Sequence, residues 1–371
     1  MPRPKNVTIT EIAAQCGVSA QTVSRVVNSR PDVSAATREA VEKAIANSGY
    51  QPSAIARGLV RRRSQTLGVI VAGLRDFGVS QILNGIAEQS QAAGYGLLLR
   101  EIADANAPEL APVVDMLISH QVEGIIFATP SHDWTIRLAD EIPKQCPPAI
   151  FLKREASPSR TTIGIDNTGG AITAVEHLLA LGRTRIAHIS GPARWLEARQ
   201  RVLGWQQTLE KAGLAAHRLV EGNWSSVSGQ DAFRLLLDRH PDIDAVFASN
   251  DQMALGVLRE ASDRGIRIPD DLAVIGFDGM SESSQFTPSL TTITQPLAAI
   301  GSAAVERLLR EIEGDEDAAP GADIVMPTQL IVRESAPAVS RQLSSPGVDP
   351  VPLHLRLAMR RALQRDAQQG A

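Results

Sequence analysis

Residues 245–278 read AVFASNDQMALGVLREASDRGIRIPDDLAVIGFD and contain one strand–helix–strand unit. The run Ala245–Ala248 predicts a strand, the stretch from Asp251 predicts a helix, and Leu272–Gly276 predicts the next strand. The same alternation continues outward in both directions. Further strands are predicted at Leu67–Val71, Gly96–Leu99, Gly124–Ala128, Ala149–Leu152, Thr162–Ile165 and Ile186–Ser190. Helices are predicted at Leu83–Ala93, at Val113–His120, after the strand Thr162–Ile165 through Leu179, around Arg199–Lys211 and through Arg310. This spacing predicts an α/β fold with parallel sheets and right-handed crossovers.

The composition is that of an ordinary globular protein. The chain has 371 residues, enough for two or three domains, and its 43% hydrophobic and 21% charged residues exclude wholesale disorder. No apolar run reaches the ~18 residues of a membrane span, and the first residues lack the apolar core of a signal peptide. The two cysteines, Cys16 and Cys146, form no CxxC motif, which excludes a disulfide scaffold and a zinc ribbon. We therefore expect a cytoplasmic protein without a cofactor or metal site.

The net charge of −4 hides an asymmetry between the two parts of the chain. Residues 1–63 carry ten Lys/Arg and four Asp/Glu, a net charge of +6, so the remainder carries −10. A basic head on an acidic body is typical of a nucleic-acid-binding domain joined to another function, although a solvated basic surface would look the same.

The basic head has the pattern of a helix-turn-helix. Thr8 and Glu11 have capping-box spacing for a first helix, and Gly17 supplies the backbone conformation that ends it. Ser19 can cap a second helix of about residues 19–28, and a third is predicted over about 35–48, ended by Gly49. The second helix combines an apolar face with a polar one, so it could enter the major groove of DNA. A generic three-helix domain without nucleic acid remains the alternative.

Two stretches carry a resemblance to a known family. Residues 7–28, VTITEIAAQCGVSAQTVSRVVN, and 33–59, VSAATREAVEKAIANSGYQPSAIARGL, resemble the N-terminus of the lactose-repressor (LacI) family of transcriptional regulators. The likeness continues through IDNTGGAITAVEHLLALGRTRIAHISGP (165–192), GNWSSVSG (222–229) and PSLTTITQP (288–296), and covers about residues 6–335. It implies a sequence-specific repressor whose affinity for operator DNA is changed allosterically by a small sugar or sugar derivative.

The resemblance also implies a domain plan. Residues 1–50 would be the helix-turn-helix domain, 51–63 a hinge helix and linker, 64–335 a two-lobed core like a periplasmic binding protein, and 336–371 a linker and C-terminal helix. Within the core, the N-lobe would comprise 64–165 with 294–322, and the C-lobe 166–293 with 323–335. The core would bind the effector and dimerise.

The resemblance places DNA contacts on two elements. Recognition-helix positions would be Ser19, Ala20, Gln21, Thr22, Ser24, Arg25 and Asn28. Ala56 and Leu59 would belong to the hinge helix, where Leu59 matches a leucine that wedges between base steps in the minor groove. Arg61–Arg63 are either phosphate contacts or a solvated linker.

Four residues match the family's ligand positions: Arg201, Trp224, Asn250 and Asp278. Arg and Asp suit vicinal hydroxyls, Asn donates and accepts hydrogen bonds, and Trp offers a flat apolar face to a sugar ring. Taken singly, Asn250 could simply cap a helix and Trp224 could be a core residue.

Three further positions each have two interpretations. Asp166 and Gln295 lie at lobe crossovers, where a hinge role is the alternative to ligand contact. Lys153 stands where the lactose repressor has a sugar-binding Asp, which points to an acidic sugar unless Lys153 is a surface residue. The repressor's serine, asparagine and arginine contacts correspond here to Ala72, Ala128 and Gln121, so the identity of the sugar cannot be inherited.

The expected partners are near-palindromic operator DNA, a small carbohydrate and a second copy of the chain. Tetramer formation stays open, because the C-terminal leucines fit no single heptad seam. The alternative function is a sugar-binding carrier without DNA function. An enzyme is not expected, because the chain has no GKS/GKT phosphate loop and GIDNTGG is only a weak glycine-loop signal.

Overall fold

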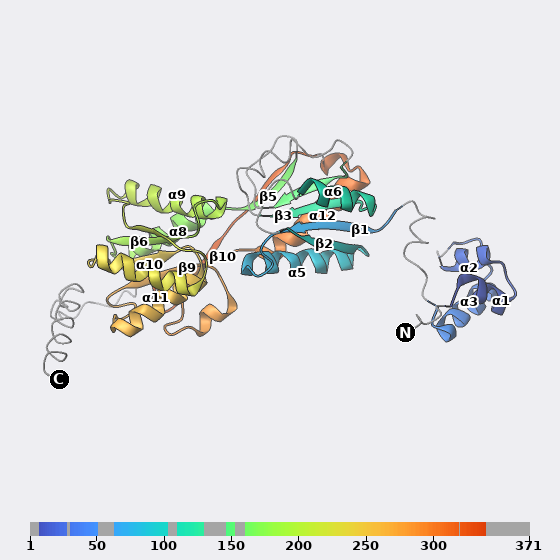
Figure 1. The fold of residues 1–371 in the computed structure, drawn as a ribbon, viewed down its shortest axis with the longest axis horizontal. Helices are drawn as coiled ribbons and strands as arrows, with labels where there is room; N and C mark the ends of the chain where they lie inside the picture. The colour runs from blue at the N-terminus through green and yellow to red at the C-terminus, as the bar shows by residue number, and fades with distance from the viewer. Residues whose placement is uncertain are drawn as a thin grey trace.

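A computed structural model describes residues 7–27, 30–50, 63–102, 110–129, 146–152, 160–318 and 320–338. The basic head forms three short helices, which Figure 1 shows as a unit of its own: α1 (Ile9–Cys16), α2 (Ala20–Val27) and α3 (Ala35–Ser48). Their contact surface is a small apolar core in which Ile12, Val23 and Val41 are fully buried. The predicted helix-turn-helix is confirmed.

The predicted helix ends of the head are also confirmed. The backbone N–H of Glu11 donates to the Thr8 side chain, and the Glu11 carboxylate accepts from the Thr8 backbone, which completes the capping box. Gly17 ends α1 with a φ of +67°, a left-handed conformation that glycine adopts without steric cost. Ser19 caps α2, because its hydroxyl accepts from the Thr22 N–H at 3.0 Å.

The N-lobe is a six-stranded parallel sheet with the order β11-β5-β4-β3-β1-β2. Helices α5 and α12 pack on one face with Leu67 and Val69, and α6 packs on the other with Ile70. The elements are β1 (Thr66–Val71), α5 (Phe77–Ala92), β2 (Gly96–Glu101), α6 (Leu110–Ser119), β3 (Gly124–Ala128), β4 (Ala149–Leu152), β5 (Thr161–Ile165), α12 (Leu297–Glu313), the 3-10 helix η3 (Glu316–Ala318) and β11 (Asp323–Met326).

The C-lobe repeats this plan with the order β12-β10-β9-β8-β6-β7, in which only β12 is antiparallel to its neighbour. Helices α10 and α11 cover one face around Phe233 and Val257, and α8 and α9 cover the other around Val175 and Trp205. The elements are α8 (Asn167–Ala180), β6 (Ile186–Ser190), α9 (Leu196–Lys211), β7 (Leu219–Glu221), α10 (Ser226–Arg239), β8 (Ala245–Ala248), α11 (Asp251–Arg264), β9 (Ala273–Asp278), the 3-10 helix η2 (Ser281–Gln285), β10 (Thr291–Thr294) and β12 (Gln329–Ile331).

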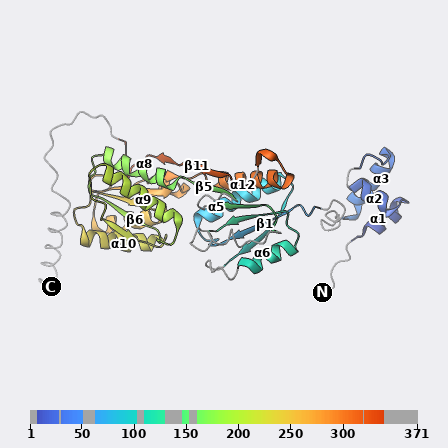
Figure 2. The ribbon, with the colours of Figure 1, turned by 90° about the horizontal axis from the view of Figure 1, so that it is seen from above.

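The chain passes between the lobes three times, as expected, but the last boundary was predicted wrongly. Strand β11 lies beside β5 in the N-lobe sheet, with Ile324 opposite Ile163, so the N-lobe extends to residue 326 rather than 322 (Figure 2). The Thr162 hydroxyl donates to the Asp323 carboxylate at 2.6 Å, and Met326 packs against the N-lobe core. The third crossover therefore lies at residues 327–328.

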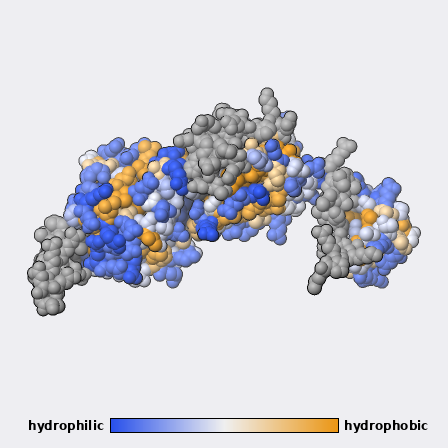
Figure 3. All heavy atoms as spheres, in the orientation of Figure 1, coloured by the Kyte–Doolittle hydropathy of each residue, from blue (hydrophilic) through white to orange (hydrophobic). Residues whose placement is uncertain are grey.

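Further differences concern the bounds of one helix and several elements that the sequence pattern did not indicate. Helix α5 begins at Phe77, whereas the sequence pattern predicted a start at Leu83. Helix α10 and the short strands β7, β10, β11 and β12 were not predicted. On the face shown in Figure 3, hydrophilic side chains gather where the two lobes meet. Within the described part of the chain, no helix is long and apolar enough to cross a membrane.

Candidate functional site

Helix α2 exposes the polar face that the sequence predicted. Val23 and Val26 are buried against the head, whereas Gln21 and Arg25 are exposed, as are Ser19 and Ala20; Thr22 and Ser24 are partly exposed. The Arg25 guanidinium lies 3.5 Å from the Asp32 carboxylate, with both side chains about half exposed. Such a pair contributes at most about 1 kcal/mol, so Arg25 can exchange it for another partner. Asn28, Ala56 and Leu59 lie outside the described residues.

A second candidate site lies between the lobes. A pocket of about 520 Å³, its open mouth included, lies between α5 of the N-lobe and the carboxyl ends of the C-lobe strands. This is where ligands bind in α/β folds. The lining consists of Asp76, Phe77, Gly78, Val79, Trp195, Glu197, Arg201, Trp224, Asn250, Gln252, Asp278 and Gln295.

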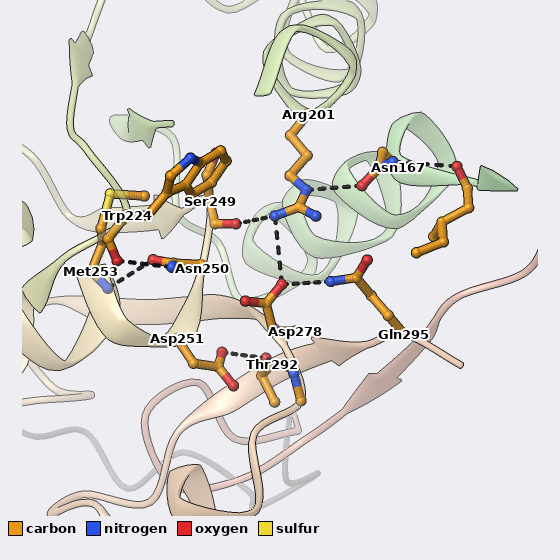
Figure 4. Close-up of polar contacts among 12 residues, drawn as sticks. Asn167, Arg201, Trp224, Ser249, Asn250, Asp251, Met253, Asp278, Thr292 and Gln295 are labelled. Carbon is orange, nitrogen blue, oxygen red and sulfur yellow. Dashed lines mark hydrogen bonds and ion pairs between the residues drawn. The ribbon is translucent and has the colours of Figure 1, made fainter. Parts of the chain in front are cut away.

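Arg201 is at the centre of the polar contacts at this site (Figure 4). It projects from α9, and its Nε donates to the Asn167 side-chain oxygen at 3.0 Å. Its Nη1 donates to the Ser249 carbonyl and lies 3.7 Å from the Asp278 carboxylate. These contacts hold the guanidinium through its Nε and Nη1 atoms.

The Arg201–Asp278 pair is buried. The side chains are 5% and 12% exposed, respectively. Burial lowers the pKa of Arg201, while the neighbouring Asp278 and Glu197 charges raise it. An arginine keeps its proton at neutral pH in such surroundings, so the site contains a true ion pair. The guanidinium carbon also lies 3.8 Å from the ring centre of Phe277, which fixes the plane of the group.

Gln295 links this pair to the crossover between the lobes. It follows β10, and its side-chain amide donates to the same Asp278 oxygen that faces Arg201. Asp278 has a φ of +112°, an unusual backbone conformation for a non-glycine residue at the end of a strand. Any ligand that bonds to Asp278 therefore acts next to a segment that connects the two lobes.

Asn250 and Trp224 combine the two roles that the sequence left open. Asn250 caps α11 by accepting from the Met253 N–H at 2.8 Å, and it also lines the pocket. Its side-chain amide donates to the Trp224 carbonyl at 3.0 Å. Trp224 packs against the C-lobe core and lines the pocket as well. Among the described residues, its indole N–H has no hydrogen-bond acceptor.

The Trp224 ring is held tightly in place. The residue has a φ of +73°, and its ring lies edge-on to Trp195 with 5.8 Å between the ring centres. A Cβ added to Gly191 would lie 2.0 Å from the ring. Only glycine at this position lets the indole lie so close to the backbone. Gly191 therefore helps to fix the position of the flat face of the Trp224 ring.

The remaining predicted positions fall elsewhere. Asp166 does not line the pocket; it caps α8 by accepting from the Gly169 N–H at 2.7 Å. Ala72, Gln121 and Ala128 are also absent from the lining, and Lys153 lies outside the described residues. The N-lobe instead contributes the start of α5.

Sequence reasoning missed several lining residues: Asp76, Phe77, Trp195, Glu197 and Gln252. Asp76 and Phe77 come shortly after β1, so the position of a polar residue beyond a strand end was the available signal. Glu197 and Gln252 lie beside predicted site residues on α9 and α11, one turn before Arg201 and two residues after Asn250.

Asp251 is a buried acid just outside the pocket. It accepts from the Thr292 and Ser283 hydroxyls and from the Met280 N–H, at 2.5, 2.7 and 2.8 Å. Burial raises its pKa to about 6 although these bonds oppose the rise. It ties the loop after Asp278 to α11, which is a structural task. No cluster of metal-binding side chains occurs within the residues that the structure describes.

Comparisons with known proteins match both parts of the chain, the head and the core. The family model described as "Bacterial regulatory proteins, lacI family" matches residues 8–53, and that of a "Periplasmic binding protein-like domain" matches 175–336. The chain is 33% identical to the lactose operon repressor of Escherichia coli K12 over 92% of this chain and 94% of that protein. It is 32% identical to catabolite control protein A of Priestia megaterium over 89% and 99%, respectively.

Solved structures give the same result. The lac repressor dimer bound to operator and the anti-inducer ONPF is 33% identical and superposes with a TM-score of 0.84, covering 90% of this chain and 100% of that one. The transcriptional regulator CelR in complex with cellobiose is 30% identical, with a TM-score of 0.67 and coverage of 89% and 100%. The chain therefore belongs to the lacI family of bacterial regulatory proteins, so it is a DNA-binding transcription regulator and not an enzyme.

Proposed function

We propose that the protein is a repressor that reads a near-palindromic operator as a homodimer, with α2 of each head in the major groove. The exposed face of α2 supports this assignment, because Gln21 can bond an adenine edge and Arg25 a guanine edge or a phosphate. Ser19, Ala20, Thr22, Ser24 and Asn28 are the other proposed contacts on this element. Two half-sites require two heads, and the related lac repressor was solved as a dimer on operator DNA.

The hinge contacts and the domain plan form part of the same proposal. Ala56 and Leu59 would enter the minor groove from residues 51–63, between the head of residues 1–50 and the core of residues 64–335. Residues 336–371 would follow as a linker and helix. A regulator of this kind works where the chromosome is, in the cytoplasm.

The effector would be a small polyhydroxylated molecule held in the interlobe pocket. The observation that carries this proposal is the buried Arg201–Asp278 pair, with Trp224, Asn250 and Gln295 around it. Charged groups of this kind form strong hydrogen bonds to hydroxyls, and an indole face suits the C–H side of a sugar ring. CelR, which shares this fold, was solved with cellobiose.

The signal would leave the pocket through Gln295. A ligand hydroxyl that bonds to Asp278 competes with the Gln295 amide for the same carboxylate oxygen. Gln295 lies on the crossover from β10 to α12, so its release changes a segment shared by the two lobes. Such coupling typically amounts to about 1–3 kcal/mol, and operator must change ligand affinity by the same factor.

The test begins with the full-length protein and a pool of random DNA duplexes. Repeated selection at moderate salt should enrich one near-palindromic sequence, and its affinity should change when a neutral or modified sugar binds. Asp278→Asn should keep DNA binding and lose the response, whereas Asp231→Asn, an exposed acid on α10, should keep both. No preference for any duplex, with or without sugars, would refute the proposal.

A further inference from the structure

Among the histidines that the structure describes, only His188 is fully buried. It lies in β6, next to the entirely apolar strand β8. An apolar side chain would fill this position without the cost of removing an imidazole from water. The contacts of the two ring nitrogens show what the imidazole contributes instead.

Both nitrogens of the His188 ring are bonded, and their roles follow from their partners. Nδ1 lies 2.8 Å from the Phe247 carbonyl oxygen, which can only accept, so Nδ1 carries the proton. Burial lowers the pKa of His188 to about 3, and the ring is therefore neutral. Nε2 of a neutral ring that is protonated at Nδ1 can only accept, so the Ser249 hydroxyl, 3.3 Å away, donates to it.

Ser249 connects this ring to the interlobe pocket. It follows β8 directly, it is fully buried, and its backbone N–H donates to the Ile189 carbonyl at 2.8 Å. Its own carbonyl accepts from Nη1 of Arg201, as Figure 4 shows. The bond from its hydroxyl to His188 is a third point of attachment. It restricts how the residue, and with it the carbonyl that faces Arg201, can turn.

A second path leads from the same ring to the guanidinium. His188 lies nearly parallel to the Phe247 ring with 4.6 Å between the ring centres, and the Phe277 ring centre lies 6.4 Å from that of Phe247. The Arg201 guanidinium carbon lies 3.8 Å from the centre of the Phe277 ring. Trp205, one turn after Arg201 on α9, stacks on His188 with 5.5 Å between the ring centres. All four rings are fully buried, so this stack supports the guanidinium with side chains that have little freedom to move.

The chemistry of the imidazole suits this position. A phenylalanine would keep the stack but leave the Ser249 hydroxyl without an acceptor, and a protonated imidazole would offer that hydroxyl only a donor. A protonated ring would also repel the charge of Arg201, which adds to burial in lowering the pKa of His188. A neutral imidazole combines the flat shape with an acceptor at the required place.

We propose that His188 is a positioning residue for the effector site. Through the Ser249 hydroxyl it fixes the carbonyl that holds Arg201, and so the orientation in which the guanidinium meets a ligand. The part that concerns a ligand rests on the proposed function. The part that concerns the guanidinium can be measured without a ligand, so the two can fail separately.

The first measurement follows Arg201 in the full-length protein without sugar. After labelling with isotopic arginine, its Nε–H signal in nuclear magnetic resonance is the one that Arg201→Lys removes. Exchange of this proton with water reports how firmly the guanidinium is held, since Nε donates to Asn167. His188→Phe and Ser249→Ala should each speed the exchange about ten-fold, the equivalent of one lost hydrogen bond. Ser190→Ala, which removes a buried hydroxyl at the end of β6, is the matched control and should change nothing. An unchanged rate in both test variants would overturn the inference.

The double variant separates positioning from a merely structural role. His188→Phe alone leaves the Ser249 hydroxyl buried without an acceptor and should lower the melting temperature. Adding Ser249→Ala removes that hydroxyl and should restore most of the lost melting temperature, because two apolar partners leave neither side chain unpaired. The exchange at Arg201 should still be about ten-fold fast and no faster than in either single variant, since both substitutions break the same bond. A rate that returns to the parent value together with the melting temperature would contradict a positioning role.

The second measurement uses glucose, galactose and cellobiose in titration calorimetry. His188→Phe and Ser249→Ala should each weaken the binding of whichever sugar the parent protein binds by about ten-fold, and Ser190→Ala should not. Unchanged sugar affinity in both test variants would overturn the inference and leave the proposed function intact. If the parent protein binds none of these sugars at millimolar concentration, the proposed sugar effector loses its support, and the exchange rate at Arg201 still decides the inference.

Discussion

The buried ion pair at the centre of the pocket should contribute to stability even without a ligand. A double-mutant cycle with Arg201→Met, Asp278→Asn and the combined variant measures the interaction between the two side chains. Coulomb attraction at 3.7 Å amounts to about 4 kcal/mol at an effective dielectric constant of about 20. Asp278 also accepts from Gln295, and Arg201 also bonds to Ser249 and Asn167, so part of each interaction survives. We expect a coupling of about 2 kcal/mol.

The single variants should be more damaging than the coupling suggests. Asp278→Asn leaves a guanidinium buried without its closest counter-charge, and breaking a buried pair from one side costs about 3 kcal/mol or more. Urea unfolding of the full-length chain, followed by far-UV circular dichroism and by tryptophan fluorescence, gives the free energies. Trp205, which is fully buried in the C-lobe, provides the local fluorescence signal.

An exposed pair provides the control. Arg259 and Asp263 lie only 2.9 Å apart on α11, but their side chains are 70% and 44% exposed. Their cycle should give less than about 0.5 kcal/mol, because water screens the charges. A coupling near zero for Arg201 and Asp278, or one no larger than that of the exposed pair, would refute the reasoning that burial outweighs distance here.

Three further predictions concern the Trp224 ring, the buried acid Asp251 and the helix-turn-helix head. Gly191→Ala should push the Trp224 ring by about 1.5 Å, because ordinary carbon contacts are about 3.5–4.0 Å and the new Cβ would lie 2.0 Å away. The sugar affinity measured by calorimetry should then fall about ten-fold. The control Gly164→Ala, whose new Cβ meets open space, should leave the affinity unchanged. Asp251 has a pKa of about 6 in the folded protein, above the value of an unfolded chain, so folding takes up a proton between about pH 4 and 6 and stability falls by about 3 kcal/mol as the pH rises through that window. Asp251→Asn should remove this fall, and equal pH dependence of urea unfolding in the variant and the parent protein would contradict the assignment. Arg25→Ala should reduce the preference for the selected operator over random duplex by ten-fold or more in competition gel shifts, because one good base contact contributes about 1–3 kcal/mol; an unchanged ratio would exclude Arg25 from base reading.

Local signals determined much of the fold, so the sequence predicted it well. The capping box at Thr8 and Glu11 and the left-handed Gly17 depend only on neighbouring residues. Strands such as Gly124–Ala128 and Ala245–Ala248 were predicted with their observed ends, because they are short apolar runs bounded by polar residues.

Tertiary contacts decided what was missed. Helix α10 begins with serines and contains Gly229, a composition that locally favours a loop. Glycine is required at this position because α11 packs directly against it. A Cβ at Gly229 would lie 2.2 Å from the Met253 carbonyl, so the backbones of the two helices are in contact. Strand β11 was assigned to the wrong lobe because four residues at a sheet edge carry no sign of which sheet they join.

The pocket residues also divide into those that the sequence could predict and those that depend on tertiary contacts. Arg201, Trp224, Asn250, Asp278 and Gln295 were predicted, and all five line one cavity. They follow strands or lie at a crossover, so topology alone brings them together. Asp76 also follows a strand, whereas Glu197 lies within α9 and carries no such mark, and only the docking of one lobe beside the other puts the two on the same pocket.

The order in which the elements enter the N-lobe has a consequence for protein synthesis. Helix α12 and strand β11 complete a domain that begins at Thr66, and a Cβ at Gly85 of α5 would lie 1.9 Å from the Ala298 carbonyl of α12. During translation the apolar side of α5 therefore stays uncovered until more than two hundred further residues have been added and α12 has left the ribosome. Nascent chains stalled before residue 297 should expose that surface and bind chaperones, whereas chains released after residue 338 should not.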